Sequence, residues 1–272
     1  MKIKVLHIVD IAGIGSILSH FHSKFDKGKS TIFYHKKNNF TLSISSYYGG
    51  TSFIKFRNLF FSSIIASRKY DIIHIHGIEH LVPIFKLLGK KVILHYHGSE
   101  IRNTQRSLDK KRIFSRSFAD LIIYNDENLE EKIITFRNVK KRFLPNPIDT
   151  DLFSKKKGEK KGGFTYVSQS LDKIKTKEEV KKIMDVTLFE ADKVQFLYKF
   201  APTIFSKYKT YVDIRITSSG EELEPLSTTA LQALSCGCEV YQMGKLIKEL
   251  PDEHKPENVI EKLISYYREI IK

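Results

Sequence analysis

The chain has 272 residues, of which 41% are hydrophobic and 28% charged, so it can form packed cores and is not an intrinsically disordered chain. It contains no run of about 18 apolar residues, which excludes a membrane-spanning helix. The formal net charge is +15. Residues 1–150 contain 25 Lys and Arg against 12 Asp and Glu, whereas residues 151–272 contain 21 against 19. A basic surface attracts the phosphates of nucleic acids, anionic lipids or charged ligands, and plain lysine-rich solvation is the alternative interpretation.

The first half of the chain alternates short apolar runs with helical patterns. The run at residues 3–9 ends in a turn that contains Gly13 and Gly15, and apolar positions then recur every three or four residues. This start reads as a buried strand rather than as a signal peptide. We expect further buried strands at residues 70–77, 91–98 and 119–125. Strands that alternate with helices in this way indicate a doubly wound α/β domain.

The composition of the sequence changes near residue 145. Residues 144–149 read LPNPID, in which each proline favours an extended backbone before it, and a lysine- and glycine-rich linker follows at residues 155–163. We therefore expect two domains, residues 1–150 and 151–272. In the second domain we expect strands at residues 163–167, 210–217 and 238–242, and helices at residues 177–184, 224–235 and 256–271.

The two cysteines are Cys236 and Cys238, one residue apart. This spacing suits neither a disulfide nor a zinc site, and we interpret both residues as small core thiols. Free thiols fit a reducing compartment, so we expect a cytoplasmic protein.

The most specific pattern lies at residues 218–240, which read SSGEELEPLSTTALQALSCGCEV. The carboxylate of Glu224 can accept hydrogen bonds from sugar hydroxyls. The amides of Leu226, Ser227 and Thr228 open the predicted helix, where free N–H groups and the helix dipole can bind phosphate. Gly237 ends the helix in the left-handed position. An ordinary strand–turn–helix with incidental polar residues is the alternative.

This pattern resembles the donor-site signature of the retaining GT-B glycosyltransferases of family 4, the glycosyl transferases group 1. The resemblance implies two Rossmann-like, doubly wound α/β domains, with a nucleotide sugar held by a reduced C-terminal domain. In the family, a second acidic residue lies eight positions after the first and contacts the ribose. Gln232 occupies that position here, and its amide can still accept one hydrogen bond.

Three positions of the first half also resemble this family. Gly13 and Gly15 lie where the family has a glycine loop that faces the donor phosphates, with simple turn glycines as the alternative. His97 matches the histidine that the family places between donor sugar and acceptor, and a strand-end histidine bonded to backbone is the alternative. His95 should share its sheet face. Residues 144–149 resemble the interdomain P-N-G-V-D segment, with Pro147 in place of the glycine.

The resemblance fails between residues 163 and 210. The family has an Arg and a Lys that reach the diphosphate, but no Arg follows the strand predicted at residues 163–167. Lys173 or Lys175 could supply the charge, with a solvated loop lysine as the alternative. The second domain must also be shortened here.

We therefore expect a retaining glycosyltransferase of the hexosyltransferase type, with His97 and Glu224 as catalytic residues. It would take a sugar from a nucleotide-sugar donor to a lipid-linked, saccharide or other acceptor, without a metal ion or another cofactor. The basic first domain suggests a peripheral protein that docks on the inner face of an anionic membrane. The residues expected to bind the donor are Gly13, Gly15, Lys173, Lys175, Leu226, Ser227, Thr228 and Gln232.

Two other functions stay open. A catalytically degenerate homologue would bind a ligand or assist an active transferase, and Gln232, the missing Arg and the short second domain motivate this hypothesis. Nucleic-acid binding is motivated by charge alone, because no known RNA- or DNA-binding motif occurs in the sequence.

Overall fold

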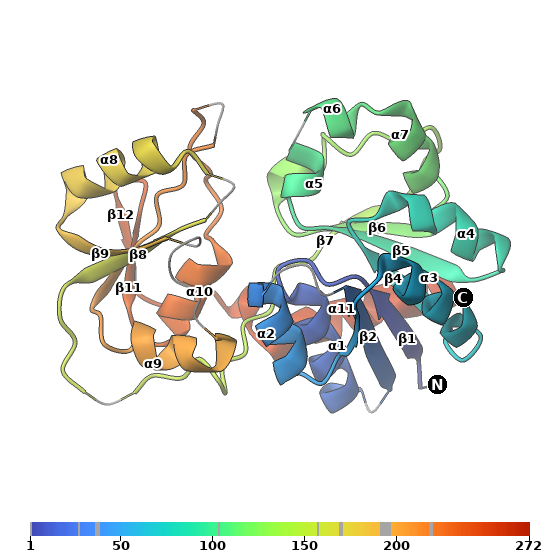
Figure 1. Ribbon diagram of the computed structural model, residues 1–272, viewed down its shortest axis with the longest axis horizontal. Coiled ribbons are helices and arrows are strands. Elements are labelled where there is room, and N and C mark those ends of the chain that lie inside the picture. Colours follow the sequence, from blue (N-terminus) through green and yellow to red (C-terminus); the bar gives the residue numbers. More distant parts are fainter. Residues whose placement is uncertain are drawn as a thin grey trace. The chain divides into compact units, whose positions relative to one another are not determined.

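The chain forms two compact units in the structure, a computed structural model (Figure 1). Unit 1 consists of residues 1–147 and 256–272, and unit 2 of residues 148–255. The structure describes residues 2–26, 28–35, 39–102, 104–156, 158–168, 171–190, 197–217 and 220–272. Each unit has its own sheet covered by helices, which confirms the predicted α/β class.

Unit 1 is built on a sheet whose described strands all run parallel, in the order β3-β2-β1-β4-β5-β6-β7. The order reverses between β1 and β4, which makes the sheet doubly wound. Its strands are β1 (Lys4–Ile8), β2 (Lys29–His35), β3 (Thr51–Phe53), β4 (Ile72–His76), β5 (Lys91–Tyr96), β6 (Leu121–Tyr124) and β7 (Lys141–Phe143). The sequence predicted β1, β4, β5 and β6, which are buried at almost every position because both faces of the sheet are covered.

Helices cover both faces of this sheet. On one face, Ile75 of β4 and Leu94 of β5 pack with Leu59 and Phe85, which belong to α3 and α4. On the other face, His74 of β4 shares a hydrogen bond of 2.9 Å with Tyr267 of α11, because successive residues of a strand point to opposite faces. The helices of unit 1 are α1 (Ile14–Phe25), α2 (Asn39–Tyr47), α3 (Phe56–Ser67), α4 (Val82–Leu87), α5 (Ser99–Arg102), α6 (Thr104–Ser107), α7 (Lys110–Arg116) and α11 (Pro256–Ile271).

The last helix belongs to unit 1, and this corrects the predicted division at residue 150. We expected residues 151–272 to form one domain, but α11 lies on the first sheet, where Tyr266 Oη donates to the carbonyl of Phe143 at 2.9 Å. The apolar positions of α11 recur every three or four residues, and they bury its inner face against unit 1. The pattern predicted the helix correctly, but a helical pattern does not say which sheet the helix covers.

Unit 2 has a smaller sheet in the order β12-β11-β10-β8-β9, in which only the pairing of β12 with β11 is antiparallel among the described strands. Its elements are β8 (Gly163–Val167), α8 (Lys173–Ile183), β9 (Val186–Glu190), α9 (Ala201–Phe205), β10 (Thr210–Val212), α10 (Thr228–Ser235), β11 (Glu239–Gln242) and β12 (Lys245–Ile247). Cys236 and Cys238 are free, buried thiols in this unit, as predicted.

Two boundaries in unit 2 differ from the prediction. Helix α8 begins four residues earlier than expected, because the side chain of Asp172 caps it by accepting the amide of Lys175 at 3.1 Å. Helix α10 begins at Thr228 instead of residue 224, because Ser227 is its N-cap and Pro225 precedes it. The predicted strand at residues 210–217 ends at Val212, and the chain beyond it turns into a small hairpin.

No helix in the described part of the chain is both long and apolar enough to cross a membrane.

Candidate functional site

The predicted donor signature lies on a hairpin and a helix start that follow β10. The hairpin forms because Ile216 bridges Glu222 in antiparallel fashion and Leu223 N donates to the carbonyl of Arg215 at 2.9 Å. Glu224 comes directly after this hairpin, and its side chain is exposed. Ser218 and Ser219, at the start of the signature, lie outside the described residues.

The start of α10 is capped by two protein groups. Ser227 Oγ accepts the amide of Ala230 at 3.0 Å, which is the usual N-cap bond. The amide of Ser227 itself donates to Asp213 Oδ2 at 2.8 Å. This corrects one part of the prediction, because a carboxylate of the protein occupies the Ser227 amide that we assigned to phosphate. The roles of Leu226 and Thr228 stay predictions.

Asp213 and Arg215 form a charged pair that the sequence analysis missed. Both follow β10, and Arg215 Nε lies 3.3 Å from Asp213 Oδ1, whose side chain is buried. Gln242, at the end of the neighbouring β11, places its Nε2 3.4 Å from Asp213 Oδ2. The signal in the sequence was the alternation D-I-R-I at residues 213–216, in which two charged residues share one side of an extended segment. An arginine therefore does lie at this edge, but it follows β10 instead of β8.

The start of α8 reaches the same edge of the sheet. The amide of Asp172 donates to the carbonyl of Ile216 at 2.8 Å, and the amide of Ile216 donates to Thr176 Oγ1 at 3.3 Å. These bonds bring Lys175 beside the hairpin, so that a Cβ added at Gly220 would lie 3.7 Å from Lys175 Nζ. Lys175 is exposed, whereas Lys173 is partly buried in the first turn of the helix. The carboxyl ends of parallel strands meet at one edge, which explains why segments 40 residues apart converge here.

Gln232, the predicted ribose contact, lies one turn into α10 and is only 6% exposed. Its position on the helix follows the predicted pattern. The side chain is thus largely buried, and its contact with the ribose stays a prediction.

The glycine turn of unit 1 has a structural explanation. Gly13 has a φ of 78°, and a Cβ there would lie 2.5 Å from Ile44 Cδ1. A Cβ at Gly15 would lie 3.0 Å from His76 Nε2 and 3.1 Å from Asp10 Oδ1. The turn thus packs too closely for larger residues, which is the alternative that the sequence left open.

The amides at the start of α1 are directed at Asp10. Ser16 N donates to Asp10 Oδ1 at 3.3 Å, and Asp10 Oδ2 also accepts the hydroxyls of Ser16 and of Ser45. Burial nevertheless raises the pKa of Asp10 to about 6, because desolvation outweighs these hydrogen bonds. As at α10, a protein carboxylate lies where we expected a phosphate.

His97 belongs to a cluster of five histidines on the α1 and α11 face of the unit 1 sheet. The strand register places His7 beside His74 and His76 beside His95, and His97 follows two residues later on the same face. Only His95 and His97 entered the sequence analysis. The alternations H-I-H at residues 74–76 and H-Y-H at residues 95–97 carried the signal, because side chains two residues apart on a strand share a face.

Hydrogen bonds link the five imidazoles into two rows. In one row, His7 Nδ1 lies 3.0 Å from His76 Nε2, and His76 Nδ1 lies 2.9 Å from His97 Nε2. In the other, His74 Nε2 lies 3.2 Å from His95 Nδ1. Burial lowers the pKa of His7 and of His97 to about 3, so both rings are neutral near pH 7.

The structure thus divides the predicted site residues between the units. It gathers Glu224, Ser227 and Lys175 at the carboxyl edge of the unit 2 sheet, with Asp213 and Arg215. It places Gly15 against His76, which in turn bonds to His97, at the carboxyl edge of the unit 1 sheet.

Comparison with known proteins identifies part of the chain. Residues 26–152 match the family Glycosyltransferase Family 4, which confirms the predicted resemblance for this segment. Among solved structures, the crystal structure of UDP-GlcNAc 2-epimerase from Neisseria meningitidis bound to UDP-GlcNAc is similar, with 13% identity and a TM-score of 0.52, over 99% of this chain and 94% of that chain. Acinetobacter baumannii MurG covers 97% of this chain and 91% of its own length, with 11% identity and a TM-score of 0.42. No curated protein matches the sequence. The likeness to the epimerase confirms the predicted pair of Rossmann-like domains, and at this identity it shows the fold alone.

Proposed function

Because residues 26–152 match Glycosyltransferase Family 4, we propose that this chain is a glycosyltransferase that takes its sugar from a nucleotide-sugar donor. The assignment of the donor site rests on one observation, the acidic and basic side chains at the carboxyl edge of the unit 2 sheet. There an exposed carboxylate, Glu224, follows the hairpin that lies beside Lys175 and contains Arg215. A sugar diphosphate needs both kinds of group, acceptors for its hydroxyls and cations for its phosphates.

The proposed chemistry is the stabilisation of a leaving diphosphate. Lys175 and Arg215 would neutralise the negative charge that develops as the bond between the sugar and the diphosphate breaks, so the step needs no metal ion. Arg215 already has Asp213 as its partner, so the phosphate would share the guanidinium with that carboxylate. Glu224 would accept hydrogen bonds from the sugar hydroxyls. Retention of configuration and a hexose as the sugar are part of the proposal.

His97 would hold the transferred sugar through hydrogen bonds of a neutral imidazole. Its low pKa, about 3, means that it neither carries a positive charge nor acts as an acid near neutral pH. The hydrogen bond to His76 fixes the orientation of the ring. We therefore assign His97 to binding and orientation of the sugar, and name no protein nucleophile.

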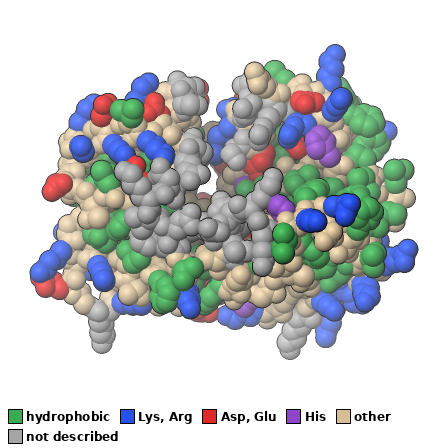
Figure 2. Space-filling view, viewed as in Figure 1, with side chains coloured by type: hydrophobic (Ala, Val, Ile, Leu, Met, Phe, Trp, Pro, Cys, Tyr) green, Lys and Arg blue, Asp and Glu red, His purple; other side chains and the backbone are tan. Residues whose placement is uncertain are grey.

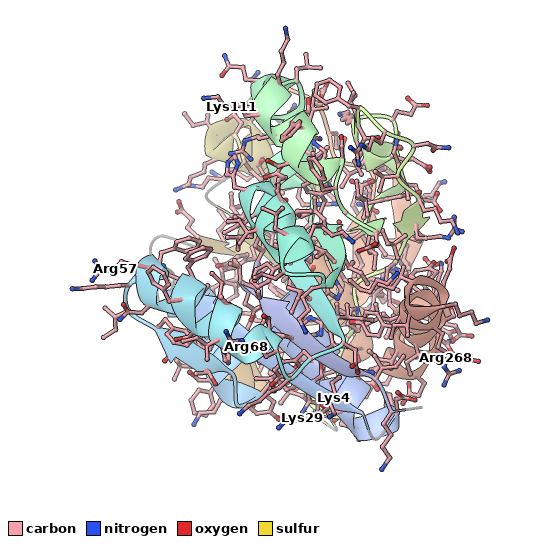
Figure 3. The ribbon with its side chains drawn as sticks, turned by 90° about the vertical axis from the view of Figure 1, so that its right-hand side faces the viewer. Lys4, Lys29, Arg57, Arg68, Lys111 and Arg268 are labelled. Atoms are coloured by element: carbon pink, nitrogen blue, oxygen red, sulfur yellow. The ribbon has the colours of Figure 1, made fainter. Side chains whose placement is uncertain are left out.

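We also propose that unit 1 docks on an anionic membrane to reach a lipid-linked acceptor, through the face formed by α3, α4 and α7 (Figure 3). Phe61 and Ile65 lie one turn apart on α3 and are 55% and 67% exposed. Arg57 and Arg68 lie at the two ends of that helix, and Lys111 lies on α7 (Figure 3). Figure 2 shows hydrophobic and basic side chains side by side over α4, at the right of the view. Exposed apolar side chains ringed by cations are typical of a helix that lies in the membrane interface.

The donor site is tested by binding and hydrolysis of a panel of nucleotide sugars. UDP-GlcNAc is the first to try, because the epimerase of similar fold was crystallised with it. Glu224→Ala should lower kcat/KM at least tenfold, since a hydrogen bond to a charged group contributes about 1.5–3 kcal/mol. Glu221→Ala is the matched control, an exposed carboxylate on the same hairpin. Equal activity of the two variants would remove Glu224 from the site.

The membrane face is tested by co-sedimentation with vesicles of anionic or neutral lipid. Binding to anionic vesicles should weaken steeply with salt, because each cation near the surface contributes about 1 kcal/mol. Changing Phe61 and Ile65 to Gln should weaken binding at least tenfold, whereas Phe25→Gln on α1, on the other face of the sheet, should not. Equal binding to neutral and anionic vesicles would contradict the proposal.

One observation favours a second candidate, a degenerate homologue that binds without catalysis. Asp213 occupies the Ser227 amide and places a negative charge at the start of α10, where a diphosphate would bind. If no nucleotide sugar stabilises the protein in a thermal-shift screen, this candidate replaces the transferase.

A further inference from the structure

The histidine cluster of unit 1 contains more ligand atoms than one sugar contact requires. His76, His95 and His97 each offer one ring nitrogen, and these three atoms all lie within 4.8 Å of one another. A tetrahedral zinc site needs ligand atoms about 3.3 Å apart, given Zn–N bonds of about 2.0–2.1 Å. The three nitrogens must therefore come closer together when an ion binds.

Two nitrogens of this triad have no bonding partner. Within the part of the chain that the structure describes, His95 Nε2 and His97 Nδ1 are buried and make no hydrogen bond. Buried polar atoms are nearly always satisfied, so each exception asks for an explanation such as an absent ion. The second possible triad, His7, His74 and His76, has one such nitrogen among the described residues, His7 Nε2, against two in the first. His76 is shared by both triads, and because both of its ring nitrogens are bonded, it would give up one of these hydrogen bonds to bind an ion.

The surroundings of the triad resemble the outer shell of a metal site. His95 Nδ1 bonds to His74, whose other nitrogen bonds to the hydroxyl of Tyr267. Such outer hydrogen bonds fix the tautomer and the direction of a metal-binding imidazole. His97, unlike His76 and His95, is only partly buried.

We propose that His76, His95 and His97 bind a divalent first-row transition metal ion of the zinc or nickel type. Imidazole ligands favour such ions, whereas magnesium and calcium prefer oxygen. The buried side chain of Glu100 lies close to this strand end, because a Cβ added at Gly77, the residue after His76, would lie 2.7 Å from Glu100 Oε1. An ion bound to His97 would occupy the imidazole that the proposed function assigns to sugar binding, so zinc would inhibit sugar transfer. The metal site itself does not depend on the proposed function.

The test is metal binding by the full chain after removal of metals with a chelator. Calorimetric titration with zinc chloride and with nickel chloride should show one ion per chain with micromolar or tighter affinity, and magnesium chloride should show no binding. Cobalt(II) should give the visible absorption of a tetrahedral site. His95→Gln and His97→Gln should each weaken zinc binding at least tenfold, whereas His80→Gln, an exposed histidine, should leave it unchanged.

Circular dichroism of each variant without metal verifies folding, and His97→Gln alone suffices if the buried His95→Gln does not fold. Absence of stoichiometric zinc and nickel binding, or zinc affinity unchanged in both variants, overturns the proposal. Loss of binding in His7→Gln together with normal binding in His97→Gln would assign the ion to the other triad and overturn it as well. None of these readouts requires sugar transfer, so a protein that binds zinc but no nucleotide sugar would refute the proposed function alone.

Discussion

The substitution Gly13→Ala tests whether the glycine turn before α1 is required for packing or for ligand binding. Alanine at φ 78° is strained by about 1–2 kcal/mol, because the Cβ of an L-residue crowds the next carbonyl in the left-handed region. The added Cβ would also lie 2.5 Å from Cδ1 and Cγ2 of Ile44, a buried residue of α2. Overpacking of this kind adds about 1–3 kcal/mol. We therefore expect Gly13→Ala to lower the free energy of unfolding of unit 1 by about 2–5 kcal/mol.

Gly49→Ala is the matched control for this change. Gly49 has a φ of 76°, but an added Cβ would have no heavy atom within 4 Å, so only the backbone strain applies. Urea unfolding followed by circular dichroism should show a smaller loss, about 1–2 kcal/mol. In the background of Ile44→Ala, the Gly13 substitution should become less destabilising, because two of the crowding atoms are absent. If Gly13→Ala is as stable as Gly49→Ala but binds nucleotide sugars less tightly, our explanation of this glycine is wrong.

The remaining predictions concern acid stability, thiol reactivity and a helix cap. The pKa of His7 falls from 6.5 in the unfolded chain to about 3 in the folded protein. Below pH 6.5 the unfolded chain therefore binds a proton that the folded protein does not, and the free energy of unfolding falls. At pH 5.5 this loss is about 1.4 kcal/mol. A His7→Gln variant should therefore show a shallower fall in unfolding free energy between pH 7 and 5, and an unchanged slope would contradict this. Burial raises the pKa of Cys236 to about 12 and that of Cys238 to about 11, so a thiol reagent at pH 8 should label both only after denaturation, and rapid labelling of the native chain would show that they are accessible. Ser227→Ala should lower the free energy of unfolding of unit 2 by about 1 kcal/mol, and Ser227→Gly by a few tenths; equal losses would show that the hydroxyl does not cap α10.

The sequence predicted the buried parts of the fold well. Strands such as β4 and β5 are short runs rich in Ile, Val and Leu, which predict a buried strand. The strands β2, β3, β7, β9 and β12 were missed. In β2 and β9 the mixed residues lack a regular alternation; β2 reads KSTIFYH. The hairpin after β10 was also missed, since the apolar positions of residues 210–217 alternate as they would in a longer strand.

The candidate site could be predicted only where a local sequence pattern determines the structure. The pattern at residues 218–240 correctly predicted a helix there, although α10 begins at Thr228 instead of residue 224. It could not show that Asp213, fourteen residues earlier, bonds to that start, because this depends on how β10 lies in the sheet. The histidine cluster needs three strands in register, and no local pattern gives the register of parallel strands.

The return of α11 to unit 1 makes unit 2 an insertion within unit 1. Residues 148–255 interrupt one compact body, and the chain closes that body only with residues 256–272. During synthesis, the part of the imidazole face that α11 covers therefore stays open until residues 256–272 have left the ribosome, because Tyr267 of α11 bonds to His74. Unit 1 thus completes its packing only after residues 148–255 of unit 2 have been made.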